Sequence, residues 1–149
     1  MNIMTDFMQL ALDQAVAASA RGEVPVGAVL VLAGQVIAAD GNRVEQLNDP
    51  SAHAEIQVIR AAAAALGRTR LDDCDLYVTL EPCPMCAGAI AHARLRRLYF
   101  GAYDPKGGGV EHGARVFARK TCHHHLEIIG GLRESAAAAL LLEFFRQRR

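Results

Sequence analysis

Two short segments of the chain contain the residues whose types and spacing are best suited to chemistry. Cys83 and Cys86 stand three positions apart, which places both thiols on one face of a helical turn. Pro84 suits the first turn of that helix, where its missing N–H costs nothing. His53 and Glu55 begin a second expected helix in the same way. A helix N-terminus favours the thiolate that a metal requires, so we expect His53, Cys83 and Cys86 to be metal ligands.

Three protein ligands leave a tetrahedral Zn²⁺ one short of its usual four. Structural zinc sites are usually closed by four protein ligands, whereas catalytic sites keep a position open for water. Glu55 is not needed as a ligand, so its carboxylate could carry protons beside the open position. A lone Cys-x-x-Cys could instead be a redox pair or half of a structural zinc knuckle. The nearby histidine motif and the prolines on both sides of Cys83 favour catalytic zinc.

The order His-x-Glu followed by Pro-Cys-x-x-Cys is the known signature of zinc nucleobase deaminases. Zinc at an open site lowers the pKa of a bound water from about 15.7 toward about 7, which supplies hydroxide at neutral pH. The hydroxide would attack a ring carbon that carries an amino group. Glu55 would take the proton from water, give it to the ring nitrogen and then pass one to the departing ammonia.

The hydrophobic pattern predicts the elements that must position these residues. A buried strand at 76–80 leads into the cysteine helix at 84–93 and then into a strand at 97–101. A strand–helix–strand unit of this length predicts that the two strands are parallel. The other expected elements are a helix capped by Thr5 and ended by Gly22, a hairpin of strands 24–32 and 35–40, a helix at 54–66, a short helix at 115–119, a strand at 126–129 and a last helix at 132–148.

The element order predicts the fold class. The strand at 24–32 is apolar on both faces, which favours a central position covered by helices on both sides. We therefore expect an α/β fold, a three-layer α/β/α sandwich around a mixed five-stranded sheet, with residues 1–149 as one domain. The segment 41–51 is expected to be a polar loop. The glycines at 107–109 predict a plain loop, since the spacing of a phosphate-binding loop is missing.

Composition narrows the function classes. The 149 residues include 16 basic and 16 acidic side chains, a balance that does not by itself indicate a nucleic-acid binder. Arginines gather after the cysteine helix and at the C-terminus. They could be solvated charges at helix ends, or they could form two basic edges that hold phosphates. No apolar run reaches the length of a membrane span, and we recognise no secretory signal. With four cysteines, two of them in a metal-type motif, we expect a reducing, cytoplasmic location.

Longer strings around the metal motifs strongly resemble the bacterial tRNA-specific adenosine deaminase family, and the resemblance extends from about residue 5 to the C-terminus. The zinc residues alone would indicate only the broader cytidine deaminase-like superfamily. The strings that carry the resemblance lie at residues 23–31, 41–43, 53–56, 76–90, 100–102 and 144–149.

This resemblance implies a function and further site residues. It implies a homodimer with one Zn²⁺ per subunit, which converts the wobble adenosine in the anticodon stem-loop of an arginine tRNA to inosine. It implies that Asn42 contacts the flipped base, although Gly41-Asn42 is also a good turn pair, as is Asp104-Pro105. The substrate contacts that it implies are Asn42, Ala54, Asp104, Arg146, Arg148 and Arg149.

Several features leave other interpretations open. The segment 107–117 departs from the Gly-Ala-Ala-Gly-Ser-like string of many family members, which affects the details of RNA contact. Residues 122–125, Cys-His-His-His, suggest a second metal, but adjacent side chains diverge and seldom share one ion. The zinc motif equally permits a deaminase of free guanine, adenosine or cytidine. A zinc-stabilised binding module or an inactive subunit is a third alternative, against which the presence of Glu55 argues.

Overall fold

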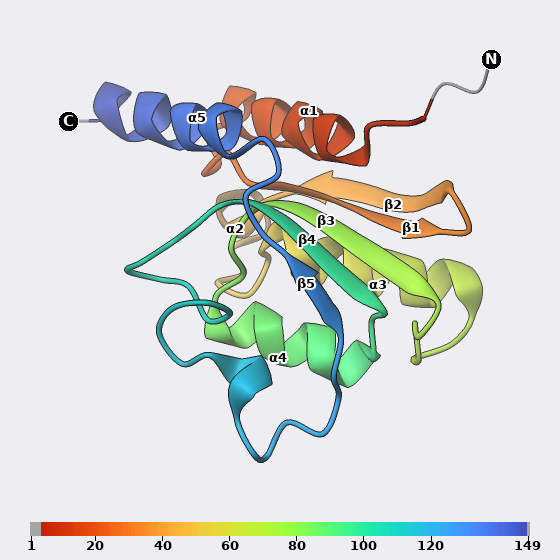
Figure 1. Cartoon of the computed structure of the whole chain (residues 1–149). Coiled ribbons are helices and arrows are strands. Elements are labelled where there is room, and N and C mark those ends of the chain that lie inside the picture. The colour runs from red at the N-terminus through yellow and green to blue at the C-terminus, as the bar shows by residue number, and fades with distance from the viewer. Residues whose placement is uncertain (1–3, 149) are drawn as a thin grey trace.

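The computed structural model describes residues 4–148. Its strands form a mixed sheet in the order β2-β1-β3-β4-β5 (Figure 1). Strand β1 is antiparallel to both β2 and β3, whereas β4 runs parallel to β3 and β5. The predicted parallel pairing across the cysteine helix is therefore confirmed. The strands are β1 Gly27–Leu32, β2 Gln35–Gly41, β3 Cys74–Leu80, β4 Arg97–Ala102 and β5 Glu127–Ile129.

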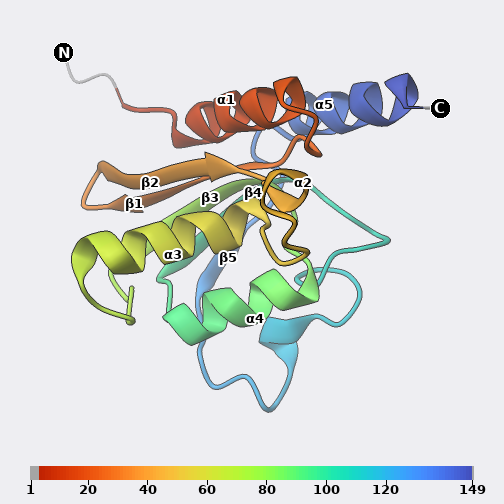
Figure 2. The same ribbon diagram turned by 180° about the vertical axis from the view of Figure 1, so that it is seen from behind.

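Helices cover both faces of this sheet. Helices α1 and α5 lie side by side on one face, and α3 and α4 lie on the other (Figures 1 and 2). The predicted three-layer α/β/α sandwich with five strands is thus confirmed. The helices are α1 Phe7–Ala20, α2 Val44–Leu47, α3 Ala54–Leu66, α4 Pro84–Ala93 and α5 Glu134–Gln147, with a 3₁₀ turn at Val116–Ala118.

Strand β1 is central, as its two apolar faces predict. Its first five residues are buried, and it is hydrogen-bonded to a strand on each side. Gly27 allows α1 to approach this strand closely, because a Cβ there would overlap the Ala11 carbonyl oxygen and lie 2.8 Å from Gln14 Cβ. On the opposite face, Leu30 and Leu76 pack with the helices α3 and α4 in the main core.

The same end of the sheet receives the starts of α3 and α4. Strand β3 ends at Leu80, where it pairs with Ala102 at the end of β4. The chain then enters α4 at Pro84. Strand β2 ends nearby at Gly41, and the segment that follows it leads to α3. This arrangement brings the His53 and Cys83 segments together although they are far apart in the sequence.

The structure corrects three sequence-based expectations. Asp6, and not Thr5, caps α1, since its side chain accepts the Gln9 N–H at 3.0 Å. The predicted polar loop at 41–51 contains the short helix α2. The last helix begins at Glu134, after Arg133 adopts a left-handed conformation. None of the helices in the described part of the chain has both the length and the apolar composition that a membrane crossing requires.

Candidate metal centre

His53 and Cys83 occupy the same position in two different helices. Each is the N-cap residue, of α3 and α4 respectively, and neither uses its side chain as a cap. The first N–H of α3 belongs to Ala54 and is accepted instead by Asn42 Oδ1 at 2.8 Å. The first residue of α4 is Pro84, which has no N–H to satisfy. Both side chains are therefore free to point toward each other.

The three expected metal ligands converge. His53 Nδ1 lies 3.6 Å from Cys83 Sγ and 3.5 Å from Cys86 Sγ. The ligand atoms of these residues all lie within 4.8 Å of one another, and within residues 4–148 this group contains those three residues alone. All four cysteines are free thiols, so Cys83 and Cys86 do not form a disulfide. One imidazole nitrogen and two sulfurs fit Zn²⁺ with one position left for a non-protein ligand.

The pKa values of the two thiols are shifted in opposite directions. A hydrogen bond from Cys86, followed by one with His53, lowers the pKa of Cys83 to about 4. The same hydrogen bond to Cys83, together with burial, raises the pKa of Cys86. The hydrogen bond with Cys83 raises the pKa of His53. The lowered pKa of Cys83 favours the thiolate that a metal requires, whereas Cys86 would have to give up its proton on metal binding.

Glu55 lies in the first turn of α3, two residues after His53. Its side chain is buried, with 4% of the residue exposed, and burial raises the pKa of its carboxyl group to about 7. Glu55 is not a member of the ligand group, yet it lines the same cavity as His53 and Cys83. A carboxyl group whose pKa is near neutral can both accept and donate a proton.

A cavity of about 590 Å³ opens onto this centre. Among the residues that the sequence predicts to touch the metal or substrate, six line it: Asn42, His53, Glu55, Cys83, Asp104 and Arg148. Cys86 is fully buried behind Cys83, and Ala54 is buried with its N–H bound to Asn42. Arg146 extends into solvent and pairs with Glu143 at 2.6 Å. Arg149 lies outside the described residues.

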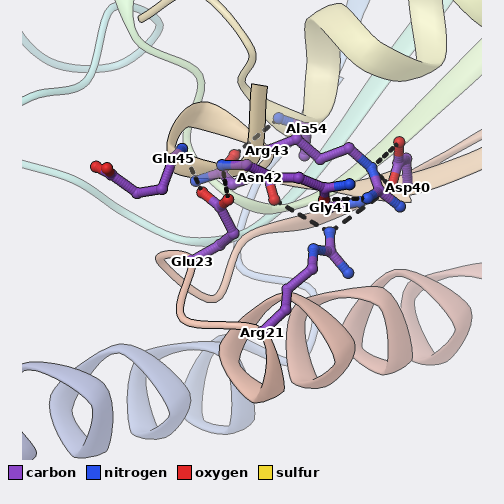
Figure 3. A network of polar contacts seen from close by, with 9 residues as sticks. Arg21, Glu23, Asp40, Gly41, Asn42, Arg43, Glu45 and Ala54 are labelled. Atoms are coloured by element: carbon purple, nitrogen blue, oxygen red, sulfur yellow. Dashed lines mark hydrogen bonds and ion pairs between the residues drawn. The ribbon is translucent and has the colours of Figure 1, made fainter. Parts of the chain in front are cut away.

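Asn42 is held from several sides (Figure 3). Its carbonyl oxygen accepts a hydrogen bond from Arg21 Nη2 at 3.0 Å, while its side-chain oxygen accepts the Ala54 N–H. Arg43 pairs with Asp40 at 2.8 Å just beside it. Because Oδ1 is already used, the Nδ2 amide group is the part of Asn42 that remains to donate a hydrogen bond into the cavity.

Two further sets of contacts shape the cavity, and the burial of Glu23 is the one that no sequence pattern indicates. Glu23 is 2% exposed, and its carboxylate accepts the N–H groups of Glu45 and Gln46, at 3.1 and 2.8 Å, in the first turn of α2. Arg148 and Phe144 also line the cavity, and the Arg148 guanidinium lies 3.9 Å from the centre of the Phe144 ring. The Glu23 contacts hold α2 in place as a wall of the cavity, and a hydrogen bond from Arg148 Nη2 to the Gly22 carbonyl oxygen, at 3.4 Å, ties the end of α5 to the segment after α1.

The histidine cluster at 122–125 lies elsewhere in the structure. His124 Nε2 contacts the Leu95 carbonyl oxygen at 2.6 Å, and the Cys122 thiol donates to the carbonyl of His124 at 3.4 Å. These contacts attach the segment to the end of α4 that is remote from the centre formed by His53, Cys83 and Cys86.

Comparison with known proteins defines the class of this fold and site. The protein-family profile described as MafB19-like deaminase matches residues 2–149. A tRNA-specific adenosine deaminase from Agrobacterium fabrum is 61% identical over 145 residues, covering 97% of this chain and 95% of the relative. A tRNA-specific adenosine deaminase from Bacillus subtilis is 43% identical over 143 residues, covering 96% and 89%.

Solved structures agree with this assignment. One from a study of A-to-I editing by tRNA:A34 deaminases has a TM-score of 0.89 and 61% identity, covering 91% of this chain and 98% of that chain. A guanine deaminase from Nitrosomonas europaea is more distant, with a TM-score of 0.81 and 27% identity, covering 93% and 82%. The fold is thus that of a deaminase. Within that class, the chain belongs to the family of tRNA-specific adenosine deaminases, which confirms the resemblance inferred from its sequence.

Proposed function

We propose that this chain is a zinc-dependent hydrolase that converts the wobble adenosine of a tRNA anticodon to inosine, and that its substrate is an arginine tRNA. One observation carries the proposal: the open three-residue centre and Glu55 line a single cavity in a chain that is 61% identical to a tRNA-specific adenosine deaminase. The arginine tRNA is the substrate that the sequence resemblance implies.

In this mechanism His53, Cys83 and Cys86 would hold Zn²⁺, which when bound makes a water molecule acidic enough to act as a nucleophile near neutral pH. Glu55 accepts a proton from the attacking water and delivers it to ring nitrogen N1. A bond forms between the water oxygen and C6, and the bond from C6 to the exocyclic nitrogen then breaks. Glu55 passes the second proton of the water to the departing amine, so adenosine and water become inosine and ammonia.

The cavity walls would recognise the base and its backbone. The Nδ2 group of Asn42 donates a hydrogen bond to an acceptor on the purine, since its Oδ1 is bound to Ala54. Arg148, which lines the cavity, offers a guanidinium that could pair with a neighbouring phosphate. Bases of an anticodon loop are already unpaired, so turning one into the cavity costs less than it would in a duplex.

The remaining parts of the proposal concern the protein in its cell. We infer that residues 1–149 act as one domain, that two copies form a homodimer with one Zn²⁺ each, and that the enzyme works in the cytoplasm. These inferences are supported by membership of the family and by the bacterial sources of its relatives. Sedimentation analysis of the purified protein would test whether two chains associate, and metal analysis would test whether each chain binds one Zn²⁺.

The decisive test is an assay for inosine in an anticodon stem-loop incubated with the zinc-loaded protein. We expect conversion at the wobble position alone, and faster conversion in an arginine anticodon loop than in a loop of altered sequence. Guanine, adenosine and cytidine should be tested in parallel, because guanine deaminases share this fold. Turnover of a free base with no conversion of RNA, even at high enzyme concentration, would favour the alternative function.

A further inference from the structure

Glu81 is a buried carboxylate that the proposed chemistry does not use. Its side chain is fully buried, and its residue is 2% exposed. Oε1 accepts the N–H of Asp104 at 3.0 Å and lies 2.8 Å from His112 Nδ1. Oε2 accepts the N–H groups of Val110, Glu111 and His112 at 3.2, 2.9 and 3.1 Å. One side chain from the end of β3 thus binds four backbone amides of a distant segment.

These contacts tie both ends of the segment 104–112 to a single point. Asp104 begins the segment and His112 ends it, so the chain between them closes around the carboxylate of Glu81. Gly108 is needed there, because a Cβ would overlap Glu81 Oε2 and lie 2.6 Å from the Asp104 carbonyl oxygen. The segment was expected to be a plain glycine loop, and the structure shows instead a closed loop around a buried anion.

The closed loop also contacts the start of the cysteine helix. The Gly109 N–H donates to the carbonyl oxygen of Pro82 at 2.7 Å, and a Cβ on Gly109 would lie 2.6 Å from Pro84 N. Asp104 and Gly107, in the first half of the loop, line the cavity together with Asn42 and residues of α2. Glu81 precedes the expected ligand Cys83 by two positions in the chain. Its side chain holds the loop whose first half forms a wall of the cavity.

The geometry points to Glu81 as a positioning residue that holds the segment 104–112 as a preformed wall of the substrate cavity and thereby sets the affinity for RNA. A hydrogen bond from an N–H group to a carboxylate is roughly twice as strong as one to a neutral acceptor. Loss of the charge would weaken these bonds, and a neutral side chain with a single acceptor oxygen would leave some of the four N–H groups, among them the buried one of Val110, without a partner, so the loop would exchange its closed form for open ones. The inference rests on the proposed function for its substrate, although the order of the loop can be measured without any substrate.

The test compares Glu81→Gln with Glu127→Gln. The glutamine keeps the shape of Glu81 but turns an NH₂ group toward amides that need an acceptor. Glu127 provides a matched control, because it makes one exposed ion pair with Arg97, at 2.9 Å, at the opposite end of the sheet. For each zinc-loaded variant we would measure amide hydrogen exchange of residues 104–112, zinc content, and KM and kcat for the stem-loop.

We expect Glu81→Gln to keep its zinc and to lose exchange protection in the segment 104–112. If the loop then holds its closed form about a tenth of the time, KM rises about ten-fold while kcat changes much less. Glu127→Gln should match the wild type in every measurement. The inference would be overturned if Glu81→Gln kept the wild-type KM and the wild-type protection of residues 104–112 against hydrogen exchange. It would also be overturned if Glu81→Gln lowered kcat and left KM unchanged.

A second variant covers the case in which Glu81→Gln does not fold. Gly108→Ala leaves the carboxylate in place and disturbs the loop from the other side, so it should raise KM and expose the same amides. A folded Gly108→Ala protein with wild-type protection and KM would overturn the inference. If the wild type converts no RNA, the proposed function fails, and the exchange measurements alone then decide whether Glu81 holds the loop.

Discussion

Asn42 has two separable roles, and two substitutions distinguish them. Its Oδ1 accepts the N–H of Ala54, a residue with no exposed surface, and its Nδ2 is free to donate into the cavity. Asn42→Ala removes both groups and leaves a buried N–H without a partner. Such a group costs about 1–3 kcal/mol, so we expect a loss of about 2 kcal/mol in the free energy of unfolding. For a chain of this size that corresponds to a fall in Tm of roughly 4–8 °C.

Asn42→Asp keeps the acceptor and removes the donor. A carboxylate at this point faces the N-terminus of α3, where negative charge is favourable, so the variant should be more stable than Asn42→Ala. Its kcat/KM for the stem-loop should nevertheless fall about 10- to 100-fold, the effect of one lost hydrogen bond to the substrate. Thermal unfolding and kinetics at equal zinc content provide the measurements. Wild-type stability in Asn42→Ala, or wild-type kcat/KM in Asn42→Asp, would refute this reasoning.

Three further predictions follow from the structure. Gly27→Ala should lower the free energy of unfolding by about 3 kcal/mol or more in denaturant titrations, because its Cβ would overlap the backbone of α1; a stable variant would contradict the packing described. Removal of zinc by a chelator should abolish activity and lower Tm, with both restored by Zn²⁺ and neither by Mg²⁺. Arg148→Ala should weaken stem-loop binding and reduce the slope of log K against log salt by about 1. Arg146 lies outside the cavity, so Arg146→Ala should change the stem-loop affinity and the salt slope less than Arg148→Ala does. Equal effects of the two substitutions would count against a specific role for Arg148.

The metal motif and the main elements could be predicted because their signals are local. His53 and Glu55 open one helix, Cys83 and Cys86 open another, and the apolar runs between them have the lengths of strands and helices. A local signal was also present at the first helix cap. Asp6 and Gln9 have the spacing of a capping pair, whereas the residue three positions after Thr5 is methionine.

The walls of the cavity depend on contacts between distant residues, which no local pattern reports. Glu23 binds the start of α2 across 22 positions of sequence, and Glu81 binds Glu111 across 30. In a sequence, both glutamates look like ordinary polar residues at the ends of strands. Their burial becomes visible only when the fold brings backbone amides to their carboxylates. The position of Arg148 in the cavity lining likewise depends on how α5 packs beside α1.

The central claim is that Glu55 moves protons at a zinc centre to which it is not bound. Its most direct test is the rate of inosine formation in the anticodon stem-loop by the wild type and by Glu55→Gln at equal, measured zinc content. We expect one Zn²⁺ per chain in both proteins and a kcat in Glu55→Gln that is lower by roughly 10²- to 10⁴-fold. A variant that loses its zinc, or one that turns over within a few-fold of the wild type, would contradict it.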